Sequence, residues 1–167
     1  VFFMSKKPYN PLMKIFFLGP EGTNSDLAAR NIFEENAEFV PLSSIEDIFE
    51  KVAMSHSYYG VIPFENSYQG VINSSLNCLI DYDLKILKEF NFSVSHNLCS
   101  ANKNFDLNSI KKITSHPQVF GQCNNWIRQN IPDVEKVVAT STAEAASQAA
   151  KDNKIFCIAN SYAFELF

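Results

Sequence analysis

Short apolar runs alternate with stretches of helical periodicity along the first half of the chain. Each run ends in a polar turn, and apolar residues then recur every three or four positions, which is typical of a strand followed by an amphipathic helix. This rhythm predicts an α/β fold in which a mostly parallel sheet carries helices on its faces. The expected strands are 14–18, 38–42 and 59–62, and the expected helices are 25–35, 45–55 and 67–81, the last capped by Asn66 or Ser67.

The pattern changes after residue 84, where polar and apolar residues alternate. This alternation predicts one long strand over residues 84–101, which would act as a hinge between two lobes. The strand-and-helix rhythm then returns and predicts a second α/β lobe. Its expected strands are 112–114, 134–139 and 155–159, and its expected helices are 119–129, 142–151 and a last one from 161, with Ser141 and Asn160 as N-caps.

These patterns also predict the domain organisation. Residues 1–13 contain Pro8 and Pro11, show no periodicity and are expected to form a disordered leader. The first lobe is expected over 14–91 and the second over 92–160. Residues 161–167 are expected to begin a truncated return of the chain to the first lobe.

Composition and charge exclude several classes of protein. The chain of 167 residues has a net charge of −4 and no basic run, which argues against a nucleic-acid-binding surface. Its apolar runs are far shorter than the ~20 residues of a membrane span, and its apolar-then-basic start reverses the order of a secretory signal. The four cysteines lack CxxC spacing, which disfavours a zinc site and predicts reduced thiols in the cytoplasm.

The polar turns after the strands offer hydroxyls, amides and free backbone N–H groups, and none of them contains lysine or arginine. Turns of this kind suit a small anion, because each helix N-terminus carries about half a positive charge. They contain no set of metal ligands, so no metal site is expected. All five glycines lie in or beside three of the polar stretches, which indicates that these stretches meet at one site. The candidate residues are Thr23, Ser25, Glu65, Asn66, Ser67, Ser115, His116, Gln122, Thr140 and Ser141.

Each candidate also has an ordinary structural interpretation. Ser115, Thr140 and Ser141 could simply cap helices, His116 could be a packed histidine, and Gln122 could be an exposed surface amide. Glu65 could act as a general acid if burial raises its pKa, or it could only stabilise its turn. The residue patterns alone leave both interpretations open.

Four segments, in order along the chain, resemble the motifs of the prephenate dehydratase family. Residues 19–25 (GPEGTNS) resemble the family's GPxGTFS signature, and residues 61–71 (VIPFENSYQGV) resemble its V(V/I)PIENSxEG segment. Residues 115–123 (SHPQVFGQC) resemble its SHPQALxQC segment, and residues 141–146 (STAEAA) resemble STAxAA. The resemblance extends over residues 14–167 and departs from the family pattern at Asn24, Phe64 and Gln69.

This resemblance implies a two-lobed fold like that of type II periplasmic binding proteins, with the active site between the lobes. It implies the conversion of prephenate to phenylpyruvate, with loss of water and carbon dioxide, in phenylalanine biosynthesis. It implies no cofactor and no metal, and a homodimer. By motif match, Glu65, Asn66, Ser115 and Gln122 would be catalytic, and substrate contacts would come from Thr23, Ser25, Ser67, His116, Thr140 and Ser141.

Two further segments of the family pattern are not among these residues. The Thr-Arg-Phe motif, with its catalytic threonine, is expected shortly after Phe167, and a regulatory ACT domain is expected beyond it. Two alternatives therefore remain beside the dehydratase. One is a non-aromatising prephenate decarboxylase, and the other is a ligand-binding relative without catalysis.

Overall fold

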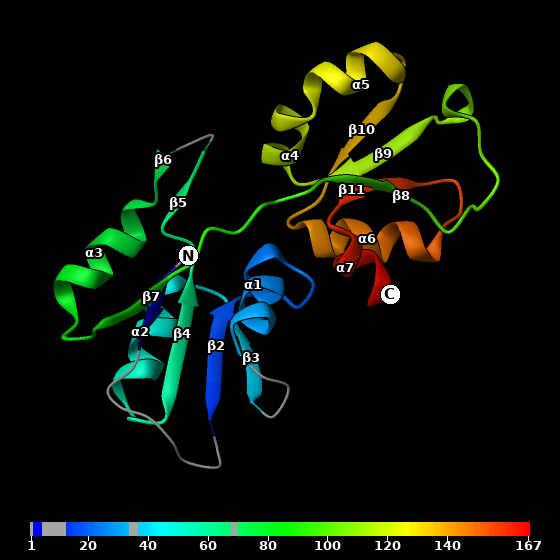
Figure 1. Cartoon of the computed structure of the whole chain (residues 1–167). Coiled ribbons are helices and arrows are strands. Elements are labelled where there is room, and N and C mark those ends of the chain that lie inside the picture. The colour runs from blue at the N-terminus through cyan, green and yellow to red at the C-terminus, as the bar shows by residue number, and fades with distance from the viewer. Residues whose placement is uncertain (1, 5–12, 34–36, 68–69) are drawn as a thin grey trace. The chain divides into compact units, whose positions relative to one another are not determined.

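The computed structural model describes residues 2–4, 13–33, 37–67 and 70–167. The chain divides into two compact units, Val1–Ser93 (unit 1) and Val94–Phe167 (unit 2), each with its own sheet (Figure 1). Three neighbouring strands run parallel in each sheet and the strands beyond them pair antiparallel, which together with the flanking helices confirms the predicted α/β class. Within the described part of the chain, no helix has the length and apolar character needed to cross a membrane.

Unit 1 contains a five-stranded sheet with helices on both faces. Phe16 of β2 faces the core formed with α2 and α3, whereas its neighbours Ile15 and Phe17 face the core formed with α1. This alternation follows from the two-residue period of a strand. The strand order is β3 (Glu38–Leu42), β2 (Lys14–Leu18), β4 (Tyr58–Ile62), β1 (Phe2–Met4) and β7 (Ile86–Glu89), and the helices are α1 (Asn24–Ile32), α2 (Ile45–Ala53) and α3 (Asn73–Asp81).

Unit 2 repeats this plan with four strands. Phe156 and Ile158 of β11 pack against the side with α4 and α5, while Cys157 and Ala159 pack against α6 and α7 on the other face (Figure 1). The strand order is β10 (Glu135–Val138), β9 (Lys112–Ser115), β11 (Phe156–Ala159) and β8 (Asn97–Cys99). The helices are η1 (Leu107–Ser109), α4 (Pro117–Gln122), α5 (Asn124–Asn130), α6 (Thr142–Lys151) and α7 (Ser161–Glu165).

The predicted long strand over residues 84–101 is wrong. The structure has two short strands instead, β7 in the sheet of unit 1 and β8 in the sheet of unit 2, and residues 90–96 form no regular element. A strand forms only where a neighbouring strand pairs with it, and residues 90–96 belong to no sheet in the described part of the chain. The alternation of polar and apolar residues therefore predicted a longer strand than the structure contains.

The predicted helix over residues 119–129 is divided at Cys123, which has φ −91° and ψ 3°. The first piece, α4, begins at Pro117, where a proline at the first turn loses no hydrogen bond. Because α5 is a separate helix that begins after Cys123, apolar residues on the two sides of the break do not share one helix face. Trp126 of α5 is 41% exposed.

Two other expectations, for the cap of α3 and for the N-terminal leader, also differ from the structure. Asn66 and Ser67 do not cap α3, because the β5–β6 hairpin (Glu65–Asn66 and Gly70–Val71) comes between and the N-cap is Ile72, which makes no side-chain capping bond. Phe2–Met4, inside the segment expected to be a disordered leader, forms β1 between β4 and β7. The rest of that leader up to residue 12 lies outside the described residues.

Candidate active site

In unit 1, the polar segments after β2 and β4 leave the sheet at the same edge. The two strands are parallel, with Phe17 opposite Val61, so their carboxyl ends lie side by side. In open α/β sheets, ligands bind at this edge. The topology thus brings five of the predicted residues to one edge of unit 1: Thr23 and Ser25 after β2, and Glu65, Asn66 and Ser67 after β4.

The turn after β2 is held together by hydrogen bonds of its own. The Thr23 hydroxyl donates to the Leu18 carbonyl at 3.1 Å and accepts from the N–H of Asp26 at 3.3 Å. Asp26 is fully buried, and its Oδ2 accepts from the N–H of Gly22 at 2.8 Å, where Gly22 has φ +82°. Arg30 Nε donates to Oδ1 of the same carboxylate at 2.8 Å. The main role of Thr23 in unit 1 is therefore to cap α1.

The segment after β4 is more open. Glu65 and Ser67 are exposed, and Asn66 is half-buried in the β5–β6 hairpin. The burial that would make Glu65 a general acid is therefore not supplied by unit 1 itself. Ser25 is half-buried near the start of α1.

In unit 2, three parallel strands end at the same edge. The carboxyl ends of β9, β10 and β11 are followed by His116, by Thr140 and Ser141, and by Asn160. The N–H of Ala139 donates to the Ser115 carbonyl at 3.0 Å, which ties two of these turns together. Ser115 is fully buried, and its hydroxyl donates to the Ile158 carbonyl at 2.6 Å, so only its lone pairs remain for a ligand.

The helix starts of unit 2 are capped by predicted site residues. His116 is the N-cap of α4, with Nδ1 accepting from the N–H of Gln118 at 3.3 Å. Ser141 caps α6 by accepting from the N–H of Glu144 at 3.0 Å. The expected capping interpretation is thus confirmed for Ser141, and it leaves the hydroxyl proton of Ser141 available.

Thr140 is hydrogen-bonded to Glu144 through both of its donors. Its hydroxyl and its backbone N–H donate to Oε2 of Glu144 at 2.5 and 2.7 Å. The hydroxyl bond, followed by the backbone bond, lowers the pKa of Glu144. An anionic ligand at Thr140 would compete with this carboxylate.

Gln122 is the exposed last residue of α4, and its Oε1 lies 2.6 Å from Nε2 of His96. His96 precedes β8, which is antiparallel to β11 with Asn97 opposite Ala159. His96 therefore enters at the edge where β11 ends, and its contact brings Gln122 to the same edge. No sequence motif singled out His96, because a lone histidine before a strand carries no signal of its partner.

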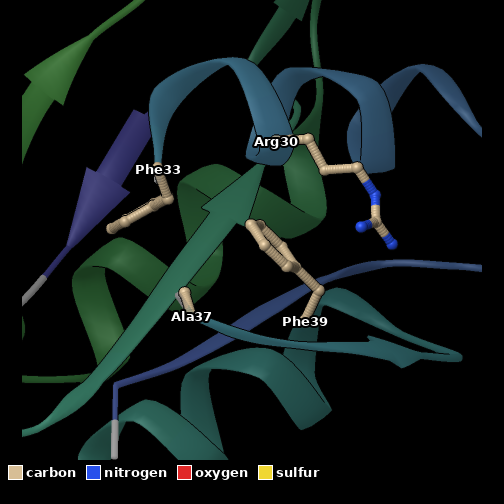
Figure 2. Close-up of a pocket in the computed structure, with 4 residues that line it drawn as sticks. All are labelled: Arg30, Phe33, Ala37 and Phe39. Carbon is tan, nitrogen blue, oxygen red and sulfur yellow. The ribbon is translucent and has the colours of Figure 1, made fainter. Parts of the chain in front are cut away.

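A pocket of about 530 Å³ lies elsewhere in unit 1, between α1 and β3. It is lined by Arg30, Phe33, Ala37 and Phe39 (Figure 2). The Arg30 guanidinium lies 4.7 Å from the centre of the Phe39 ring and bonds to Asp26. None of these four residues belongs to the four motifs. We therefore assign the candidate chemistry to the strand ends and not to this pocket.

The strand ends provide hydroxyls, amides and helix starts, which suit an oxyanion. The described residues contain no cluster of three or more histidine, cysteine or acidic side chains that could hold a metal ion. The arrangement in each unit can bind and orient a small acid through neutral donors.

Comparison with known proteins agrees with these features. The family model described as prephenate dehydratase matches residues 15–167. The chain is 32% identical over 151 residues to a bifunctional chorismate mutase/prephenate dehydratase of Aquifex aeolicus, covering 90% of this chain and 41% of that protein. It is 32% identical over 148 residues to a prephenate dehydratase of Methanocaldococcus jannaschii, covering 86% of this chain and 52% of that protein.

A solved structure is also similar. The crystal structure of a prephenate dehydratase from Staphylococcus aureus matches with a TM-score of 0.81 and 30% identity, over 92% of this chain and 57% of that chain. The present chain thus spans about two fifths to three fifths of the length of these relatives.

Proposed function

Because this chain belongs to the prephenate dehydratase family, we propose that the protein containing it converts prephenate to phenylpyruvate, with loss of water and carbon dioxide. The observation that carries this proposal is the extent of the family match. It runs through residues 15–167 and includes all four polar motifs and parts of both units. A match to a single motif would not distinguish an enzyme from a binding module of the same fold.

The substrate is a ring acid with two carboxylates, and unit 2 supplies neutral donors for it. Gln122 is exposed and can donate from its amide nitrogen. Ser141 lies at the start of α6, where the helix N-terminus favours negative charge. Ser115 can accept a hydrogen bond from a substrate hydroxyl. Thr140 contributes least, because both of its donors are bound to Glu144.

Unit 1 would supply the remaining contacts. Asn66 and Ser67 follow β4 at the edge where parallel strands end, with Glu65 beside them. Ser25 lies near the start of α1, and Thr23 shapes its turn more than it binds. We propose that these residues are substrate contacts, as the motif resemblance implies.

The chemical step needs little beyond orientation and a proton for the leaving hydroxyl. Loss of water and carbon dioxide makes the ring aromatic, which drives the reaction. Positioning the substrate and stabilising developing charge with fixed donors can then account for catalysis. The proposed reaction uses no metal and no cofactor. We further propose a place in phenylalanine biosynthesis, a cytoplasmic location and a homodimer, in keeping with the family.

The test is an assay of the full-length gene product with prephenate, in which the absorbance of phenylpyruvate is followed. Phenylpyruvate formation is expected. A dihydro product would instead indicate a non-aromatising decarboxylase, and binding without turnover would indicate a catalytically inactive relative. Either result would overturn the proposal.

Replacing Gln122 by alanine should lower kcat about 100-fold, the usual loss when one donor to a developing charge is removed. Folding should be unchanged, because the side chain is exposed. Gln129→Ala is the matched control, since Gln129 is an exposed glutamine of α5 in the same unit. Equal turnover of the two variants would show that Gln122 does not contact the substrate.

A further inference from the structure

His96 and Gln122 are held together within unit 2, although 26 positions separate them. The β8–β11 pairing fixes the backbone beside His96, and α4 fixes that of Gln122. The distance of 2.6 Å between Nε2 and Oε1 is that of a short hydrogen bond. The contact therefore joins two rigid elements at the edge where the parallel strands end.

The other nitrogen of the ring determines which atom is the donor. His96 Nδ1 is buried and has no hydrogen-bond partner among the described residues. A buried N–H without a partner is rarer in proteins than an acceptor without one, so the proton belongs on Nε2. The opposite tautomer would also place the lone pair of Nε2 against the lone pairs of Oε1. The stable arrangement is thus Nε2–H donating to the Gln122 oxygen.

This arrangement fixes the direction of the Gln122 amide. With its oxygen held by His96, the side chain presents its two amide N–H groups and not its oxygen. An amide that could rotate would present an acceptor part of the time, which repels a carboxylate.

We propose that His96 is a positioning residue, which holds the Gln122 oxygen so that the amide nitrogen faces the anionic substrate. This inference rests on the proposed function, because it takes Gln122 to be a substrate contact. It adds a residue that belongs to none of the four motifs.

The test uses two substitutions in the full-length gene product. His96→Leu removes the donor, and His96→Gln keeps an N–H at a similar reach. We expect His96→Leu to lower kcat/KM about 10-fold, the equivalent of one hydrogen bond. His96→Gln should restore most of that loss. His56→Leu is the matched control, because His56 is exposed in a turn, and it should leave kcat/KM unchanged.

The same substitution is then made in the Gln122→Ala background. If His96 acts through Gln122, His96→Leu should cause no further loss there. A repeated 10-fold loss in that background would overturn the proposal, as would a His96→Gln variant as poor as His96→Leu. A merely structural role would lower activity in both backgrounds.

¹⁵N NMR of the imidazole gives a readout that does not depend on turnover. The expected result is a protonated Nε2 and a bare Nδ1, with a coupling to Gln122 that is lost in Gln122→Ala. A protonated Nδ1 in the neutral ring would overturn the proposal. If the NMR result is as expected but prephenate is not converted, the proposed function fails while the His96–Gln122 contact stands.

Discussion

The turns at residues 22–26 of unit 1 and 140–144 of unit 2 share one hydrogen-bonding plan. In each, the N–H of the first residue donates to a carboxylate four positions later, at 2.8 Å to Asp26 and at 2.7 Å to Glu144. The two carboxylates differ in their surroundings. Asp26 is completely buried, whereas Glu144 is exposed.

The hydroxyl groups that cap α1 and α6 can be compared in the same way. Thr23 and Ser141 each accept from the N–H of the acidic residue three positions later. Thr23 also donates to the Leu18 carbonyl, so its hydroxyl is used twice. The hydroxyl of Ser141 serves only as an acceptor among the described contacts.

The difference shows that similar local bonds can have different consequences. A hydrogen bond in the interior is stronger than one in water, and its loss leaves a buried group without a partner. The turn of unit 1 therefore acts as a rigid frame with its donors satisfied internally. The turn of unit 2 retains a hydroxyl proton for a ligand.

The largest effect is expected for Asp26→Ala. The substitution removes the buried carboxylate that accepts from the N–H of Gly22 and forms an ion pair with Arg30, so the free energy of unfolding should fall by about 3 kcal/mol. Urea denaturation followed by circular dichroism measures this change. Glu144→Ala is the matched variant at the exposed turn and should cost less than about 1 kcal/mol. Equal losses would contradict the role given to burial.

The capping hydroxyls should give an intermediate effect. Thr23→Ala removes two hydrogen bonds and should cost about 2 kcal/mol, whereas Ser141→Ala removes one cap bond and should cost about 1 kcal/mol. Ser44→Ala is a suitable control, because Ser44 caps α2 by accepting from the N–H of Asp47 at 3.0 Å. Thermal unfolding of the three variants should place Ser44→Ala beside Ser141→Ala. A Thr23→Ala variant that is no less stable than these two variants would show that the hydrogen bond to the Leu18 carbonyl is unimportant.

Local sequence predicts the first two parallel strands well, since the bounds of β2 and β3 agree with the expected 14–18 and 38–42. β2 lies inside the sheet and is buried on both faces, so it is apolar along most of its length, whereas β3 is a partly exposed edge strand. Elements that depend on a distant partner were not predicted. β1 exists through its pairing with β4 and β7, and no periodicity within three residues can reveal that.

The candidate site shows the same limit. The N-caps at Ser141 and Asn160 follow from residue type and spacing, and both are confirmed. Asp26 was missed, although its place three residues after Thr23 is the spacing of a capping carboxylate. His96 could not have been found in this way, because only the pairing of β8 with β11 brings it to Gln122.

The smallest effect concerns the charge of Glu144. Its bonds from the Thr140 hydroxyl and N–H lower its pKa below the usual 4.5, so the ionised form stabilises the folded state above that pH. This contribution should disappear as the pH falls through the lowered pKa, where the folded carboxylate takes up its proton. Glu144→Gln should therefore be less stable than the unmodified protein at pH 7, by about 0.5 kcal/mol because the site is exposed, and equally stable at low pH.

Urea denaturation at a series of pH values measures the difference. Glu165→Gln, which removes the charge of another exposed carboxylate, is the control. A loss of stability in Glu144→Gln that stays constant down to low pH would contradict this. It would mean that the Glu144 side chain stabilises the exposed turn by packing and not through the Thr140 hydrogen bonds to its ionised carboxylate.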